Sequence, residues 1–321
     1  MALVHGFNLR NLRGDILGGI TAAVVALPLA LAFGNAALGP GGAIYGLYGA
    51  VVVGFFAALF GGTPSQVSGP TGPMSVTVAG VITTLAVSGI STELSAGEIL
   101  PLVMAAVVLG GIFQILFGIL KLGKYITLVP YSVVSGFMSG IGVIILALQI
   151  GPLFGIETRG GVVDSLSTLL GNFEPNWAAF GVGIMTLGIV FLTPRRISQW
   201  VPSPLLALLI VTPLSILFFN DAVLSGYGIE PINRINSAGA IPEGLPKLDL
   251  NFVPFLIPGN PQFTFILRSG LILAVLGAID SLLTSLVADN ISQTRHNSDR
   301  ELIGQGIGNG LAGLFNGLPG A

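Results

Sequence analysis

One carboxylate lies inside a stretch of the sequence that is otherwise apolar. Between Arg268 and Asp289, the only charged residue is Asp280. An ionised acid at the centre of a membrane-spanning helix costs roughly 2.5–3.5 kcal/mol on insertion scales, so such a residue is a functional candidate by default. Thr284 lies four residues further on, on the same helix face. We therefore predict a cation or proton site at Asp280 and Thr284. The alternative is an aspartate that only accepts hydrogen bonds from neighbouring helices.

A second candidate site is the segment Ser68-Gly69-Pro70-Thr71-Gly72-Pro73-Met74-Ser75. Two prolines and two glycines within five residues are incompatible with a continuous helix. After Pro73 the sequence can resume as a helix, with Thr71 as its N-terminal cap. The N–H groups and the positive dipole end of this half-helix would then point into the middle of the membrane, where an anion can bind. We predict an anion site at Thr71, Gly72 and Ser75; the alternative is a plain kink or a re-entrant corner.

Other patterns indicate structure more than chemistry. Gly136/Gly140 and Gly304/Gly308 have the GxxxG spacing that is typical of closely packed helices. His296 falls between two predicted spans, where we expect it to be solvated. The sequence shows no metal cluster, Ser-His-Asp set or phosphate-binding Gly-Lys motif, so we expect no enzyme and no cofactor. Because no basic cluster exceeds two residues, we also expect no nucleic-acid partner.

The composition indicates an all-α membrane protein in which these residues are held by apolar helices. Charged residues make up 8% of the chain, against about 25% in soluble domains. After Asp15 the next charge is Glu93, which leaves 77 residues without one. Since a spanning helix needs roughly 20 apolar residues, this run alone holds about three passes. We place spans at 14–34, 42–62, 66–89, 99–120, 126–151, 177–194, 203–220, 266–290 and 301–318.

The distribution of basic residues predicts the orientation of these spans. If the N-terminus is cytoplasmic, eight basic residues fall in inside segments: Arg10, Arg13, Lys121, Lys124, Arg195, Arg196, Arg295 and Arg300. Only Arg159, Arg234 and Lys247 fall in outside loops, while Arg268 lies at the outer edge of a span. Cytoplasmic segments carry the excess of Lys and Arg. We therefore expect a multi-pass protein of a bacterial plasma membrane with a cytoplasmic N-terminus.

An internal similarity predicts two halves. Residues 57–64 match residues 312–319 at five of eight positions, at an offset of 255. Seven spans in the first half would invert the second half, which is the plan of many secondary transporters; the alternative is chance similarity between two Gly/Ala-rich helices. We predict a cytoplasmic N-terminus at 1–13, a seven-span repeat at 14–220, an outside loop at 221–265 and the start of an inverted repeat at 266–321.

The sequence resembles the SulP anion transporters (solute carrier family 26), and most closely the sodium-dependent bicarbonate transporters among them. The resemblance lies in Gly69–Pro73 and in the residues from Asp280 through Asn309. It implies fourteen spans in two inverted seven-span repeats, core and gate domains, and a cytoplasmic STAS domain. It also implies that Asp280 and Thr284 help to bind sodium and that Thr71 contacts the anion. Because the sequence stops at Ala321, we expect about nine of the fourteen spans here and no STAS domain.

The function expected from this resemblance is sodium-coupled bicarbonate uptake by alternating access, with sodium as the coupling ion. The expected partners are bicarbonate or another small inorganic anion, sodium, the lipid bilayer and, in the full-length protein, a second copy of the chain. Three alternatives remain open at this point. They are a proton-coupled sulfate or dicarboxylate carrier, a passive anion channel, and a fragment that transports nothing.

Overall fold

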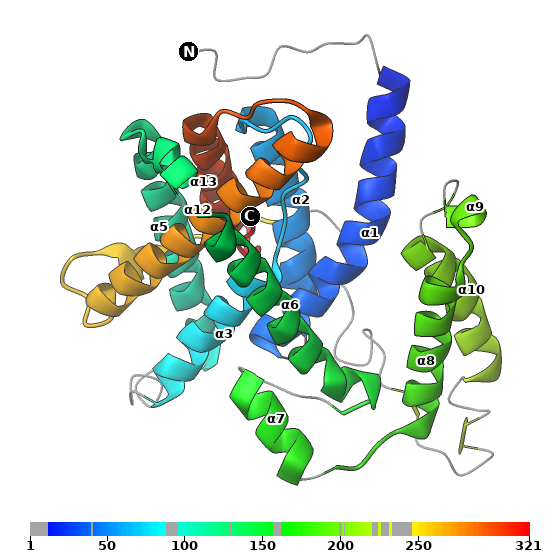
Figure 1. The fold of residues 1–321 in the computed structure, drawn as a ribbon. Coiled ribbons are helices and arrows are strands. Elements are labelled where there is room, and N and C mark those ends of the chain that lie inside the picture. Colours follow the sequence, from blue (N-terminus) through cyan, green and yellow to red (C-terminus); the bar gives the residue numbers. More distant parts are fainter. Residues whose placement is uncertain are drawn as a thin grey trace.

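The computed structural model describes residues 12–39, 41–87, 96–128, 130–156, 162–171, 173–198, 201, 203–219, 224–225, 231–232 and 246–321. Within these residues the regular structure is helical (Figure 1). The α-helices are α1 (Leu12–Leu38), α2 (Ala43–Phe60), α3 (Gly72–Val87), α5 (Ala96–Ile119), α6 (Tyr131–Leu153), α7 (Val162–Gly171), α8 (Trp177–Leu192), α9 (Arg195–Ser198), α10 (Ser203–Phe218), α12 (Phe263–Ser292) and α13 (Ser298–Leu314). Two 3-10 helices are η2 (Leu122–Leu128) and η4 (Val253–Leu256).

Each of the nine predicted spans overlaps one of these helices, and four of the helices are long and apolar enough to cross a membrane: α1, α2, α5 and α12. Local signals explain several helix ends. Asn176 caps α8 by accepting hydrogen bonds from the N–H groups of Ala178 and Ala179, both at 3.0 Å. Asn297 caps α13 by accepting from the N–H group of Arg300 at 3.0 Å. The ten-residue helix α7 was not predicted, because its residues lie in an expected loop.

A tightly packed bundle of α2, α5, α12 and α13, with α3 against it, forms the centre of the molecule (Figure 1). Glycines allow its backbones to approach closely. A Cβ atom on Gly304 would lie 2.4 Å from Cα of Gly61, and one on Gly111 would lie 2.3 Å from N of Gly310. Close packing at Gly304 and Gly308 is therefore confirmed, whereas the same prediction for Gly136 and Gly140 of α6 is wrong. A Cβ atom on either would meet nothing within 4 Å in the described part of the chain.

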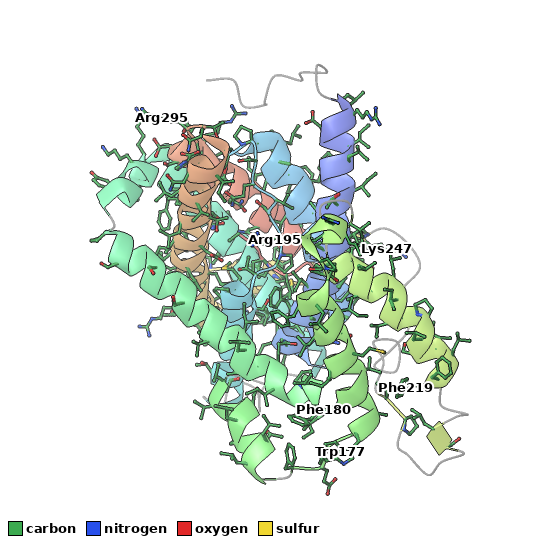
Figure 2. All side chains as sticks on the ribbon, turned by 45° about the vertical axis from the view of Figure 1, so that its right-hand side comes forward. Trp177, Phe180, Arg195, Phe219, Lys247 and Arg295 are labelled. Atoms are coloured by element: carbon green, nitrogen blue, oxygen red, sulfur yellow. The ribbon has the colours of Figure 1, made fainter. Side chains whose placement is uncertain are left out.

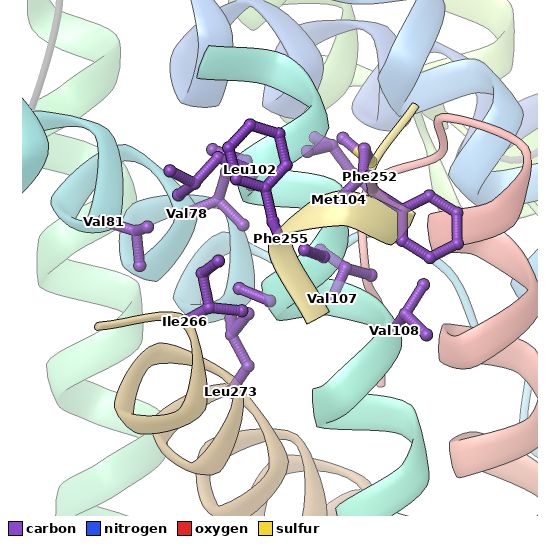
Figure 3. Packing of buried hydrophobic residues seen from close by; sticks show 14 of the residues in the cluster. Val78, Val81, Leu102, Met104, Val107, Val108, Phe252, Phe255, Ile266 and Leu273 are labelled. Carbon is purple, nitrogen blue, oxygen red and sulfur yellow. The ribbon is translucent and has the colours of Figure 1, made fainter. Parts of the chain in front are cut away.

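The main hydrophobic core lies where α3, α5 and α12 meet η4 (Figure 3). Phe252 and Phe255, at the start of η4 and within it, are 4% and 8% exposed and belong to this core. The backbone N–H of Asp249 also donates to the carbonyl of Leu314 at 2.9 Å. The end of the segment 221–265, which we expected to be a loop, is thus packed onto the bundle; most of residues 221–245 lie outside the described residues.

Helices α6, α8 and α10 lie at the side of this bundle, and α8 and α10 pack against each other (Figure 1). Their outer surfaces carry large apolar side chains, such as Phe191 and Leu192, which are both 81% exposed. Such surfaces are expected of helices that face lipid. Arg295 lies at the end of the molecule where α1 begins, and Trp177 lies at the opposite end (Figure 2).

Candidate functional site

The predicted break before the third helix is present in the structure. Residues 61–71 are not helical, and α3 begins at Gly72. Pro70 forms an antiparallel bridge with Gly320, and Gly69 and Ala321 exchange hydrogen bonds of 3.1 Å and 3.4 Å through their backbone groups. Irregular backbone within a membrane is tolerated where protein buries it or a cavity lies beside it. Here two irregular segments, each following a helix of the bundle, supply hydrogen-bond partners to each other.

Thr71 joins the start of α3 to the carboxylate in α12. Its hydroxyl donates a hydrogen bond to Oδ2 of Asp280 at 2.9 Å, and its carbonyl accepts from the N–H of Ser75 at 2.9 Å. Thr71 therefore stands at the cap position, but its hydroxyl is bonded to Asp280 and not to the helix N–H groups as we had expected. Asp280 is 5% exposed, in the middle of α12. The two sites predicted separately from the sequence are thus adjacent.

A pocket opens beside the first turn of α3. It is small: the space that a water molecule can occupy is about 10 Å³, which is room for about one water, and the pocket is partly open to the outside. None of its lining residues is charged, and they come from three helices: Phe33 and Ala36 of α1, Gly72, Ser75 and Val76 of α3, and Ile145, Leu148 and Gln149 of α6. Two of the three predicted anion-binding residues, Gly72 and Ser75, therefore line one cavity, and the third, Thr71, precedes Gly72 directly.

The hydroxyl of Ser75 has an unusual environment in this pocket. Ser75 is 2% exposed, and its Oγ atom has no hydrogen-bond partner among the described residues. A buried hydroxyl without a partner costs about 1–3 kcal/mol. Such an orphaned group often marks a place where a ligand or water binds. Ser75 can donate its hydrogen to an anion that lies at the start of α3.

Thr284 lies one helical turn beyond Asp280 and is partly exposed. The residue that follows each of them, Ser281 or Ser285, also carries a hydroxyl. Ser285 bonds to Thr63 and Gln66, each at 2.8 Å, while the buried Oγ of Ser281 has no partner among the described residues. Asp280, Thr71 and Thr284 supply carboxylate and hydroxyl oxygens, which are the ligands that hard cations prefer. Sodium binding by Asp280 and Thr284 stays a prediction.

Some residues of this region could not be identified from the sequence. Gln149 lines the pocket, but a single amide in the last turns of an apolar helix gives no periodic signal. Glu301 is 2% exposed, so Asp280 is not the only acid buried in the bundle. We had placed Glu301 at the first residue of a span. An error of one turn there moves a side chain from water to the protein interior.

The connection between α12 and α13 corrects our expectation for His296. Its Nδ1 atom lies 2.7 Å from Oδ2 of Asp289, and its Nε2 atom lies 2.8 Å from Oγ of Ser298. The histidine side chain is 6% exposed and is therefore not solvated. The sequence also did not reveal this Ser-His-Asp arrangement. Within the loop it ties the last turn of α12 to the first residue of α13.

Comparisons with known proteins extend over the whole chain. The model of the Sulfate permease family matches residues 12–321. "Bicarbonate transporter BicA" of Picosynechococcus sp. is 44% identical over 100% of this chain and 54% of that protein. The protein of the same name from Synechocystis sp. is 45% identical over 100% of this chain and 53% of that protein. The chain thus spans about half the length of the curated relatives it matches.

One solved structure gives the same result. "The transmembrane domain of a cyanobacterium bicarbonate transporter BicA" superposes with a TM-score of 0.81 at 43% identity. The superposition covers 99% of this chain and 76% of that one. The proteins named in these comparisons are transporters and not enzymes.

Proposed function

The chain belongs to the sulfate permease family, and from this premise we propose that it forms the substrate-binding part of a sodium-coupled bicarbonate transporter. The observation that carries the proposal is the hydrogen bond from Thr71 to Asp280. It connects the start of the half-helix, which favours an anion, to a buried carboxylate, which favours a cation. The two relatives named as bicarbonate transporters support the choice of anion.

The charges around the pocket favour a monovalent anion. A helix N-terminus provides roughly half a positive charge. The lining residues add neither lysine nor arginine, so the protein offers little further compensation there. The N–H groups of the first turn of α3 and the hydroxyl of Ser75 would bind the anion. Sodium beside Asp280 would balance the carboxylate and add positive charge close to the pocket. Each ion would then raise the affinity for the other, as linkage requires.

We propose alternating access because the pocket lies between two parts of the molecule. One wall consists of α1 and α3, which pack against the bundle, and the other wall consists of α6. In the proposed mechanism the bundle carries the loaded site past α6, so that the pocket opens alternately to the two sides of the membrane. Inward movement of sodium down its gradient would drive the uptake of bicarbonate.

The experiment that tests the proposal measures the uptake of radiolabelled bicarbonate by the full chain in proteoliposomes, with and without a sodium gradient. We expect Asp280→Asn to abolish sodium-dependent uptake, because the amide cannot neutralise a cation. Asp15→Asn, which changes an exposed acid at the start of α1, is the matched control and should leave uptake unchanged. Sodium dependence that persists in Asp280→Asn would remove Asp280 from the site.

Proton-coupled sulfate transport is the second candidate, because a buried carboxylate can also carry a proton and because the family takes its name from sulfate. The same assay separates the two candidates. Sulfate uptake that follows a pH gradient and ignores sodium would favour the second, whereas bicarbonate uptake that requires sodium would favour the first.

A further inference from the structure

Helix α13 carries a row of buried polar side chains that the proposed function does not use. Glu301, Gln305 and Asn309 follow one another at four-residue spacing, and none is more than 2% exposed. Four-residue spacing places them on one face of the helix. Buried amides and carboxylates are costly unless they are hydrogen-bonded. Each of these three side chains has a partner in one of the two irregular segments, residues 61–71 and 315–321.

Asn309 binds one residue of the second segment at two points. Its Oδ1 accepts a hydrogen bond from the N–H of Gly320 at 2.7 Å, and its Nδ2 donates to the carbonyl of Gly320 at 2.9 Å. Nδ2 also donates to Oε1 of Gln114 in α5 at 2.7 Å. The Asn309 amide therefore forms hydrogen bonds with both the N–H and the carbonyl of Gly320, as the backbone of a neighbouring β-strand would.

Gly320 is the residue that bridges to Pro70. Proline has no N–H group to donate, and the backbone groups of Gly320 are turned to Asn309 instead. Next to this pair, Gly69 and Ala321 lie opposite each other and form the hydrogen bonds between the two segments. The position of Gly69 and Pro70, and with it that of Thr71, thus depends on a segment that Asn309 holds.

Glu301 and Gln305 bind the first segment near its start and near its end. Oε2 of Glu301 accepts from the N–H of Gly62 at 2.8 Å. Nε2 of Gln305 donates to Oε1 of Glu301 at 2.9 Å and is hydrogen-bonded to the hydroxyl of Ser68. The single face of α13 therefore binds both irregular segments within the bundle.

We infer that Asn309 is a positioning residue for the site at Thr71 and Asp280. It touches neither ion; it fixes Gly320, and through the bridge to Pro70 it fixes the distance between the Thr71 hydroxyl and the Asp280 carboxylate. This inference rests on the proposed function for its consequence in transport, but its structural part can be tested without any transport measurement.

The test compares Asn309→Leu with Leu302→Ala in the full chain. Leucine has a similar size but makes none of the three hydrogen bonds. Leu302 is a buried apolar residue of the same helix, 1% exposed, and its truncation weakens packing without touching the polar row. Hydrogen–deuterium exchange is measured on peptides that cover residues 61–75. We expect faster exchange of these peptides in Asn309→Leu than in Leu302→Ala. Equal exchange in the two variants would overturn the inference.

Transport gives the second readout. In Asn309→Leu we expect the half-saturating concentrations of sodium and bicarbonate to rise together by about fivefold or more. A change in affinity of this size corresponds to the lower end of typical coupling free energies. The maximal rate per folded molecule should change less. Leu302→Ala should leave both concentrations unchanged; if it shifts them equally, loss of stability alone explains the effect and the inference fails. A parent protein that transports without sodium would instead contradict the proposed function, and the exchange experiment would still decide the role of Asn309.

If Asn309→Leu does not fold, Gln114→Leu provides a milder change. It removes only one of the three hydrogen bonds of Asn309 and leaves both contacts with Gly320. We then expect a smaller increase in exchange of residues 61–75 in the same direction. No increase at all would count against the inference.

Discussion

Glycines of similar spacing have opposite environments in the two parts of this molecule. In the central bundle, a Cβ atom on Gly304 would overlap the backbone of Gly61, and one on Gly306 would lie 2.6 Å from the carbonyl oxygen of Gly111. In α6 and α8 at the side, a Cβ atom on Gly136, Gly140 or Gly181 would meet nothing within 4 Å in the described structure. At these positions the bundle has backbones in direct contact, whereas α6 and α8 have open space in the described part of the chain.

This difference indicates which part keeps its shape during transport. Packed interiors have few arrangements and transmit strain, so the bundle can hold Thr71 and Asp280 at a fixed separation. Helix α6 touches α3 and provides one wall of the pocket, and among the described residues a Cβ atom on its Gly136 or Gly140 would meet nothing within 4 Å. The proposed site therefore lies between the closely packed bundle and a helix that is packed more loosely in the described part of the chain.

The largest effect should come from adding a methyl group to the bundle. Gly304→Ala places a Cβ atom 2.4 Å from the Cα atom of Gly61, and backbone cannot yield as a flexible side chain can. Overpacking costs about 1–3 kcal/mol and more where helices must separate. We expect a lower thermal midpoint and little monodisperse protein in detergent. The control Gly140→Ala should behave as the parent; equal loss in both variants would remove the distinction between the two regions.

A hydroxyl comparison should give an intermediate effect. Ser285 in the bundle and Thr186 in α8 each donate to the carbonyl four residues earlier, both at 2.8 Å. Only Ser285 also lies 2.8 Å from the hydroxyl of Thr63, which can donate to it, and 2.8 Å from Oε1 of Gln66, which shares the single hydrogen of Ser285 with the Ser281 carbonyl. Ser285→Ala leaves these partners unpaired, which costs about 1–3 kcal/mol. Thr186→Val should change stability by less than about 0.5 kcal/mol. Thermal unfolding of the two variants provides the measurement.

The smallest effect on stability should come from Gln149, although it faces the proposed site. Gln149→Ala removes a polar group from the wall formed by α6 and should leave the thermal midpoint unchanged, because the residue is exposed. If its amide binds the anion, half-saturating bicarbonate should rise about tenfold, which corresponds to roughly 1.5 kcal/mol for a hydrogen bond to a charged group.

A labelling experiment checks the same wall directly. The 321 residues contain no cysteine, so Gln149→Cys introduces a single thiol into this part of the protein. We expect a small anionic thiol reagent to modify it and bicarbonate with sodium to slow the modification. Unchanged labelling with both ions present would exclude α6 from the binding pocket.

The residues of the site that were predictable from the sequence are those that cost much free energy to place in a membrane-spanning helix. A carboxylate such as Asp280 amid apolar residues, and two prolines beside Thr71, have no inexpensive place in a spanning helix. This cost predicts that each residue lies beside a cavity or a hydrogen-bond partner. In the structure, Thr71 and Asp280 are hydrogen-bonded to each other. The nine helical stretches were predictable for the same reason, since the absence of charges over 20 residues has few explanations.

The features that were not predictable depend on which face of a helix contacts which neighbouring helix. GxxxG spacing is the same at Gly304/Gly308 and Gly136/Gly140, and only the first pair faces another backbone. Glu301 and His296 lie near span ends, where a shift of one turn decides between solvent and interior. The contact of Asn309 with Gly320 joins residues whose sequence positions give no sign of it. These properties are set by tertiary packing.

The direction of the hydrogen bond at Thr71 has one more consequence. A hydroxyl has a single hydrogen, and that of Thr71 is committed to Asp280, so the oxygen presents only lone pairs to its other neighbours. A negatively charged solute arriving first would meet these lone pairs. If sodium binds the carboxylate as proposed, it competes with this hydrogen and frees the Thr71 hydroxyl to turn toward the anion. The proposed function then favours binding of the cation before the anion.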